Sequence, residues 1–249
     1  MVKLGRRIRN RIIIRMVNFL RTLLLVSLPV FANDNIITIE QTGDTFEFGV
    51  DQIGYGNKVL MLDNNSYINA TSLGMYLVQY NHSSGINTIT FDEISGTGNK
   101  MKLGQGIAWD ALDSETNLDW SNDGYEGGGH EITLSMYGDY NKLAVQQTNQ
   151  GSIIGHDFDL HLAGDYNEVQ IKQQGNGSKD IDLTIYNDYN DVFIRQKGTN
   201  NTHTANITLD GLYGTDFTLK QFGSSGSQSY TISIDCLNPS GCLTNVIQE

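Results

Sequence analysis

The chain has 249 residues, with 16 basic and 28 acidic side chains and a formal net charge of −12 at pH 7. This acidity disfavours nucleic acid and anionic membranes as partners. Glycine is abundant, with 27 residues, whereas the chain has only 2 prolines. Because glycine permits tight turns and proline cannot donate to a strand ladder, this composition favours a body made almost entirely of strands.

Residues 1–32 predict a secretory signal peptide. They carry seven basic residues and no acidic one, and end in a short apolar run from Thr22 to Ala32. A basic start, a short apolar core and a small final residue are typical of such a signal. Met16 is an alternative start. A membrane anchor is the alternative interpretation, but Arg21 leaves the run well short of the roughly 20 residues needed to span a bilayer.

Removing the predicted signal makes the protein more acidic. Without its seven basic residues, 9 of the 16 remain against 28 acidic residues, a net charge of −19.

The next stretch alternates apolar and polar residues with a period of 11, which predicts short strands. The repeating sets are Ile37, Ile39, Gln41; Phe46, Phe48, Val50, Gln52; and Asn57, Val59, Met61, Asp63, with a turn at Gly54. The pattern is blurred over 64–98, where 75–79 and 86–91 are predicted strands of undefined register. It returns at Gly96, Asn99 and Gln105.

Residues 107–129 form an acidic insertion that contains both tryptophans. Oxygen-rich acidic loops bind calcium, but the spacing matches no known calcium loop, so a solvated excursion is favoured. The five histidines have no zinc-site spacing and are expected at the surface. No metal or cofactor is predicted.

One pattern recurs in the second half of the chain: GDYNKLAVQQ from Gly138, GDYNEVQIKQ from Gly164 and NDYNDVFIRQ from Asn187, with a degenerate copy ending at Gly223. Counted from the last polar residue of each turn, apolar residues follow at +2 and +4, and glutamine follows at +6. Even offsets share one face of a strand. The copies recur every 23 to 26 residues, which indicates a structural repeat.

Each repeat reads as strand, turn, strand, with both apolar rows on one side. A single pair of strands is marginal in water, whereas stacked pairs share a continuous core. We therefore predict an all-β fold over 33–235, a cross-β β-solenoid with two strands per rung.

Buried amides must be hydrogen-bonded, and stacked copies can bond one another in ladders. The predicted ladder residues are Asn57, Asn99, Asn141, Asn167, Asn190, Gln52, Gln105, Gln147, Gln173, Gln196 and Gln221. The predicted turn residues are Gly54, Gly96, Gly138, Gly164 and Asn187.

Residues 236–249 are predicted to form a C-terminal cap. In an exported chain, two close cysteines favour a disulfide, here Cys236–Cys242. It would pin the last turn and the final strand.

No catalytic motif is present, so the chain is not predicted to be an enzyme. Asp139, Asp165 and Asp188 recur in the turns. They could form a carboxylate column for ion binding or polysaccharide cleavage, but Asp also stabilises tight turns, and turn chemistry is the favoured interpretation.

The joint pattern Gln-x-Gly-x-x-Asn, with an apolar residue at +2 and glutamine at +6, resembles the curlin repeat of curli subunits. The resemblance runs from Gln41 to about Gly223 and is strongest in YGDYNKLAVQQ at 137–147; QIGYGNKVLM at 52–61 keeps the opening glutamine. It implies a secreted structural subunit of functional amyloid fibres on a Gram-negative cell surface, serving biofilm matrix and adhesion. It also implies self-association, and export through an outer-membrane pore with chaperones.

Several features depart from the curlin pattern. Met136, Leu162 and Ile185 replace the first-strand glutamine, and the insertion and cysteine pair are additions. These departures fit a minor, nucleating or capping subunit. The alternative function is a monomeric secreted β-solenoid adhesin that binds glycan or a surface.

Glu168, Asp191 and Asp216 are predicted to form one outward column in the stack. Like charges directly opposite repel. Assembly is therefore predicted to quicken as pH falls toward the carboxylate range or as salt rises.

Overall fold

The computed structural model describes residues 11–13, 35–38, 45–53, 56–60, 72–80, 85–91, 94–106, 128–149, 155–198, 202–223 and 227–249. The predicted signal, apart from 11–13, lies outside these ranges. So do residues 107–127 of the predicted insertion, and Gln41, Gly54 and Asp63 of the early repeats.

The described residues form two layers of strands and no helix. One layer is a nine-stranded sheet: β1 (Arg11–Ile13), β3 (Thr45–Ile53), β5 (Ser72–Tyr80), β7 (Lys100–Gln105), β9 (Leu143–Asn149), β11 (Val169–Gly175), β13 (Val192–Lys197), β15 (Phe217–Phe222) and β17 (Thr244–Gln248). The other contains β2 (Asn35–Thr38), β4 (Asn57–Leu60), β6 (Ile89–Thr90), β8 (Thr133–Met136), β10 (Asp159–Leu162), β12 (Lys179–Ile185), β14 (His203–Leu209) and β16 (Gln228–Ile234).

The even-numbered strands make a three-stranded and a five-stranded sheet, which backbone hydrogen bonds connect. Ile89 N donates to Glu131 O at 3.1 Å, and Phe91 N donates to Thr133 O at 3.2 Å. The two sheets therefore continue one another as a single layer opposite the odd-numbered strands.

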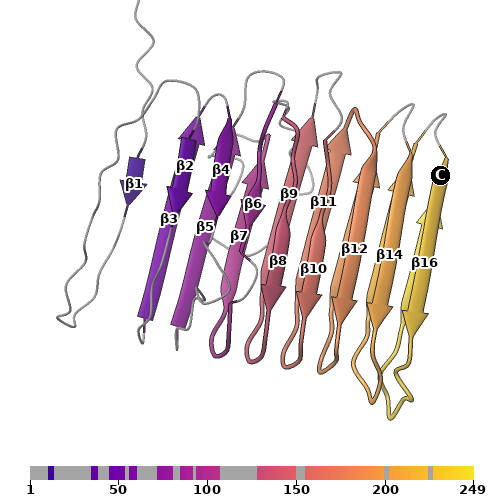
Figure 1. Cartoon of the computed structure of the whole chain (residues 1–249). Helices are drawn as coiled ribbons and strands as arrows, with labels where there is room; N and C mark the ends of the chain where they lie inside the picture. The colour runs from indigo at the N-terminus through magenta and orange to yellow at the C-terminus, as the bar shows by residue number, and fades with distance from the viewer. Residues whose placement is uncertain are drawn as a thin grey trace, which may run out of the picture.

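Successive rungs are parallel and in register. Each even-numbered strand and the odd-numbered strand after it form one rung, and the rungs stack in chain order from the indigo to the yellow end (Figure 1). Every strand pairing is parallel except that of β1, which is antiparallel to β3. The predicted all-β solenoid with two strands per rung is confirmed.

The core lies between the two layers. Alternation along each strand turns its apolar residues inward, so Leu143 and Val145 of β9 lie in register with Val169 and Ile171 of β11. All four are buried, and the inward rows of the opposite layer are buried with them. Burying a side chain of this size contributes roughly 1.5–3 kcal/mol, so the stacked rows provide the main stabilisation of the fold.

The turns from even to odd strands need a left-handed backbone. Asp139, Asp165 and Asp188 have φ angles of 77°, 73° and 70°, a conformation that Asp and Asn tolerate better than most residues. A Cβ added at Gly138 would lie 2.7 Å from Asp165 Oδ1, so the turn glycine leaves room for the aspartate of the next rung. These contacts accord with the turn interpretation of the three aspartates.

The blurred region is part of the same stack. In it, β5 pairs with β3 and β7, and β6 pairs with β4. The register that the sequence left undefined therefore comes from strands on either side of it.

The outward face of the central odd-numbered strands is not open to solvent. Lys102, Gln146 and Lys172 are buried although they alternate with the core residues. Period-two alternation in the sequence separates the two faces of a strand. It does not indicate whether the face that points away from the core is exposed to solvent or covered by other residues.

Within the described residues, no helix is long and apolar enough to cross a membrane.

Candidate functional site

A ladder of glutamine side chains runs through the described rungs. Each Nε2 donates to Oε1 of the glutamine one rung closer to the N-terminus, at 2.5–3.0 Å. The ladder consists of Gln52, Gln79, Gln105, Gln147, Gln173, Gln196, Gln221 and Gln248. It therefore has a polarity, with donors facing the N-terminal end and acceptors facing the C-terminal end.

The same amides bridge the two layers. Gln147 Nε2 donates to Asp157 O at 2.7 Å, and Gln173 Nε2 donates to Asp180 O at 3.0 Å. Gln79, Gln105, Gln196 and Gln221 make the equivalent bond to the strand opposite. Because a flipped amide would set its oxygen against that carbonyl oxygen, the bridge fixes the orientation of each amide and hence the ladder polarity.

Two members of the ladder were not in the predicted set. Gln79 is the residue before the last of β5, in the region of undefined register, and Gln248 ends the final strand. Both follow apolar residues at even spacing, Leu77 and Val246, which is the signal that identified the other members. Neither could be assigned to the ladder without knowing which strands are neighbours.

A second ladder closes the turns from even to odd strands. Asn141 Nδ2 donates to Asn99 Oδ1, Asn167 Nδ2 to Asn141 Oδ1, and Asn190 Nδ2 to Asn167 Oδ1, at 2.6–3.2 Å. These side chains also donate to turn carbonyls, for example Asn167 to Gly164 O at 3.0 Å. The series ends where Thr215 follows Asn190, and Asn190 Oδ1 and Thr215 Oγ1 have no hydrogen-bond partner in the described part of the protein.

The assignment of Asn57 to this ladder is wrong. Asn57 begins β4, which belongs to the even-numbered layer, and Asn87 Nδ2 donates to its Oδ1 at 3.3 Å. Asn57, Asn99 and Asn141 are 42 residues apart in the sequence, a regular spacing that is compatible with a single column. Both strands of a rung have the same alternation, so spacing alone does not show to which layer a strand belongs.

The column that contains Asn57 becomes basic further along the stack. His130, His156, Lys179 and His203 occupy the equivalent position before or at the start of β8, β10, β12 and β14, and all four are buried. The expectation that the histidines lie at the surface is therefore wrong for these three, whereas His161 is exposed. Each buried histidine lies two residues before an inward apolar residue. This spacing indicates an inward-facing position, whereas zinc-site spacing does not address burial.

The predicted turn residues lie over one another. Gly96, Gly138 and Gly164 take the same place in successive turns, and a Cβ at each would approach the aspartate of the next rung. Asn187 follows them, and its Nδ2 donates to Gly211 O at 2.7 Å. Gly54 lies outside the described residues.

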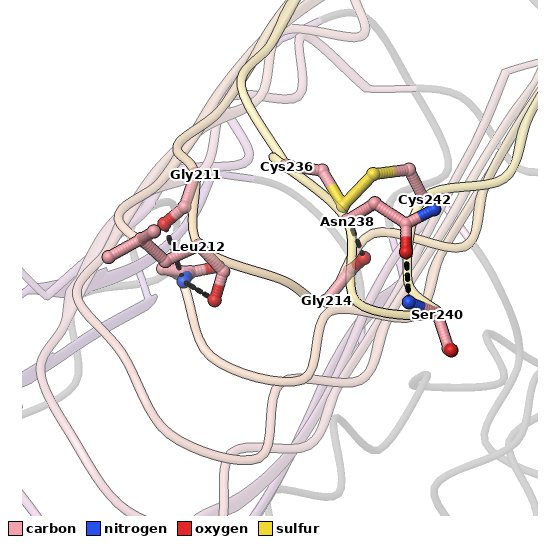
Figure 2. Close-up of a disulfide and its surroundings, with 8 residues drawn as sticks. Gly211, Leu212, Gly214, Cys236, Asn238, Ser240 and Cys242 are labelled. Carbon is pink, nitrogen blue, oxygen red and sulfur yellow. Dashed lines mark hydrogen bonds between the residues drawn. A yellow bond between two sulfur atoms is a disulfide. The ribbon is translucent and has the colours of Figure 1, made fainter.

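The last turn is closed by a disulfide. Cys236 and Cys242 are bonded, with Cα atoms 5.8 Å apart (Figure 2). Cys236 Sγ also contacts Gly214 O in the previous rung at 3.4 Å, and Cys242 N donates to the same oxygen at 2.8 Å. Cys242 follows Thr215 in the asparagine column, so a covalent bond closes this turn where asparagine closes earlier ones.

The rung formed by β16 and β17 is an open end of the stack. Most of its residues are exposed, and its inward residues Ile232, Ile234 and Val246 are only partly buried against the core. Gln248 is exposed, and among the described residues no further glutamine donates to its Oε1. Both the apolar row and the amide ladder therefore reach this end without a neighbouring rung.

A row of tyrosines lies on the outside of the turns. Tyr140 and Tyr166 stack with ring centroids 5.0 Å apart, and Tyr166 and Tyr189 stack at 5.1 Å. All three are exposed.

The predicted acidic column is present on the outer face of the odd-numbered layer. Burial and the neighbouring carboxylates Asp216 and Glu168 raise the pKa of Asp191. Lys142 Nζ forms an ion pair with Glu168 Oε2 at 2.5 Å, which offsets part of the repulsion at one end. The column therefore favours partial protonation of Asp191 as pH falls.

No metal centre is formed by the described residues, in which no three His, Cys, Asp or Glu side chains group as ligands. The acidic residues of 110–126 lie outside those ranges.

No protein-family model, curated protein or solved structure matches this chain. The resemblance to curlin repeats rests on the residues quoted above, and the family assignment stays a prediction. The arrangement of the described residues offers stacking surfaces and hydrogen-bond ladders.

Proposed function

We propose that the protein is a secreted structural subunit of curli-like functional amyloid fibres, in which the rung stack of one copy continues into the next. The observation that carries this proposal is the open C-terminal rung. There an in-register glutamine ladder and an apolar row both end at a surface of the same chemistry as the interior.

The ladder polarity determines which partner surface fits. Gln248 presents an acceptor at the C-terminal end, so the matching surface must present a donor amide together with an apolar row. At the other end of the ladder, the rung that contains Gln52 has both. In the structure β1, which lies in the predicted signal, pairs with β3 of that rung, so removal of the signal would free this edge. Copies would therefore add head to tail, with each new interface repeating the interior contacts.

Edge strands with unpaired backbone groups are templates for further strands, and natural monomers usually cover or charge them. The described part of β16 and β17 has neither a proline nor a lysine. The disulfide holds the rung closed. A nucleating or capping subunit is consistent with such an end, because a rigid last rung would template the first rung of the next molecule.

Incubating the oxidised protein from residue 33 onward tests the proposal. Fibres are expected, with a meridional reflection at about 4.7–4.8 Å from the strand spacing. Val246→Glu and Ile247→Glu form a matched pair, because both place one charge on β17. Val246 faces the core and Ile247 faces outward. Fibre growth should slow strongly in Val246→Glu and change little in Ile247→Glu.

A protein that stays a soluble monomer over the same period would overturn the proposal. It would favour a monomeric adhesin, the alternative that the exposed row of Tyr140, Tyr166 and Tyr189 supports. Aromatic rows contact glycans and other surfaces through large, rigid, amphipathic rings. Binding to a panel of polysaccharides that is lost in the triple Tyr→Ala variant would establish that alternative.

A further inference from the structure

Four basic residues form an unbroken column inside the solenoid. Lys179 pairs with His203 in the register of β12 and β14, and the residues at the same position in the two rungs before are His156 and His130. The rings of His130 and His156 meet edge to face with centroids 4.8 Å apart. No other interior column of the described rungs holds ionisable groups at successive positions.

The column lies against the turns that lead from odd to even strands, where Lys179, His156 and His203 meet backbone carbonyls. Lys179 Nζ donates to Gly175 O at 2.6 Å and Gly177 O at 2.9 Å. His156 Nδ1 and Nε2 each lie 2.8 Å from a carbonyl oxygen, of Gly155 and Gln174, and His203 Nε2 lies 3.2 Å from Phe222 O. All these partners are neutral, and the two carbonyls beside His156 raise its pKa by less than burial lowers it.

The charged groups that act on the three imidazoles are members of the column itself. Lys179 acts on His130, His156 and His203, and His130 acts on His156. The carboxylates nearest in sequence, Glu131, Asp157 and Asp180, alternate to the outer face. Protonation of an imidazole would therefore place a second buried positive charge beside a first, with no carboxylate facing it.

We propose that this column is a proton-sensitive device that confines the folded solenoid to pH values at which its imidazoles are neutral. The proposal concerns the stability of one molecule and does not depend on the fibre role. The column sets a minimum pH for the folded state, which the acidic surface by itself would not set.

The direction of the effect follows from linkage. Burial lowers the pKa of His130 to about 3, lowers that of His156 well below its ordinary value and lowers that of His203. Below about pH 6.5, the ordinary pKa of histidine, the unfolded chain therefore binds protons that the folded chain does not. The contribution of the neutral imidazoles to the free energy of unfolding is fully present above pH 6.5. It is lost as pH falls from 6.5 toward the pKa values of the folded state.

The other shifted groups are separated from the imidazoles by pH or by sign. Burial lowers the pKa of Lys179 to about 8, so Lys179 affects stability between pH 8 and its ordinary pKa of 10.5. Burial and neighbouring carboxylates raise the pKa of Asp159 and Asp180 from 3.8, so protonating these two residues adds stability as pH falls. A loss of stability as pH falls from 6.5 to 5 therefore has the sign of the imidazoles and the opposite sign to these carboxylates.

The experiment is urea unfolding of the soluble, oxidised monomer at pH values from 7.5 to 5. For each fully engaged imidazole, the unfolded-to-folded ratio should rise about tenfold for each pH unit below 6.5. In His130→Asn/His156→Asn this rise should shrink, because asparagine occupies the same column at positions 57 and 87. His161→Asn is the control, because His161 is exposed and lies outside the column.

A wild-type stability that is unchanged or higher at pH 5 would overturn the proposal, as would a double variant with the wild-type profile. If the double variant does not fold, two further measurements decide. His203→Gln places in β14 the residue that Gln228 supplies in the next rung and should also reduce the pH dependence. Proton NMR of the folded wild type should show His130 and His156 staying neutral between pH 7.5 and 5; protonation of either imidazole in the folded protein within this range would refute the device.

Discussion

Each inward glutamine combines a bond along the stack with a bond across it. Gln173 accepts from Gln196, donates to Gln147 and donates to Asp180 O in the opposite layer. A buried amide is stabilising only when its partners are present, and one missing member leaves its neighbours unsatisfied. The ladder therefore disfavours strand pairings that are out of register more than it adds to the net free energy of unfolding.

Gln173→Ala should lower the free energy of unfolding by about 1–3 kcal/mol, because it leaves Gln147 Oε1 and Asp180 O buried without the hydrogen bonds that Gln173 donates to them. Urea unfolding at pH 7.5 measures it. Thr208→Ala is the control: Thr208 is exposed on β14, so its effect should stay within about 0.5 kcal/mol. Equal effects of the two substitutions would contradict the role of the ladder.

Substituting a turn aspartate distinguishes the turn interpretation of these residues from the ion-binding interpretation. Asp165 has a φ of 73°, so Asp165→Ala should cost roughly 1 kcal/mol while Asp165→Asn and Asp165→Gly are tolerated, because Asn and Gly accept the left-handed region. Thermal unfolding with and without calcium measures both effects. A carboxylate column for ions would instead make Asn as damaging as Ala and would show calcium-dependent stabilisation in the wild type only.

At the scale of elements, the stack uses two means to close equivalent turns. Asn99, Asn141 and Asn167 close interior turns with hydrogen bonds to the turn backbone. No described rung follows the last turn to continue such a ladder, and the Cys236–Cys242 disulfide closes this turn instead. A covalent bond keeps the terminal rung in shape where stacking acts from one side only.

Reducing the disulfide should destabilise the terminal rung locally. Closing a loop of this length contributes roughly 2 kcal/mol by chain entropy. Amide exchange should therefore quicken at Cys242 and Glu249, which donate to Gly214 O and Gln221 O, while Val169 and Val192 keep their protection. Cys236→Ser/Cys242→Ser should match the reduced protein. Uniform acceleration along the whole chain would show that the bond acts globally.

The whole molecule balances two opposing responses to acid. Its outward carboxylates repel in columns, and its interior holds imidazoles that resist protonation. The first response is expected to favour the proposed assembly toward the carboxylate range, whereas the second weakens the fold below pH 6.5. Both arise because a stack in register places like residues over like residues.

Assembly should quicken with added salt at pH 7.5, because salt screens the column of Glu168, Asp191 and Asp216. The pKa of Asp191 is raised by burial and by these neighbours, so the repulsion is present above that pKa and is relieved as pH falls through it. Asp191→Asn should assemble faster than wild type at pH 7.5 and respond less to salt. Asp210→Asn, an exposed residue outside the column, should behave as wild type; flat thioflavin kinetics across salt would refute the repulsion.

The repeats by themselves determined the solenoid, because period-two alternation, turn residues and a fixed glutamine offset all concern neighbours within one rung. The tertiary structure decided which rungs are adjacent and which layer each strand joins. Hence Asn57 pairs with Asn87 rather than with Asn99, and Gln79 and Gln248 complete the glutamine ladder. The burial of His130, His156 and His203 was also decided there. Each lies two residues before an inward apolar residue, but only the folded rung shows that this position is enclosed.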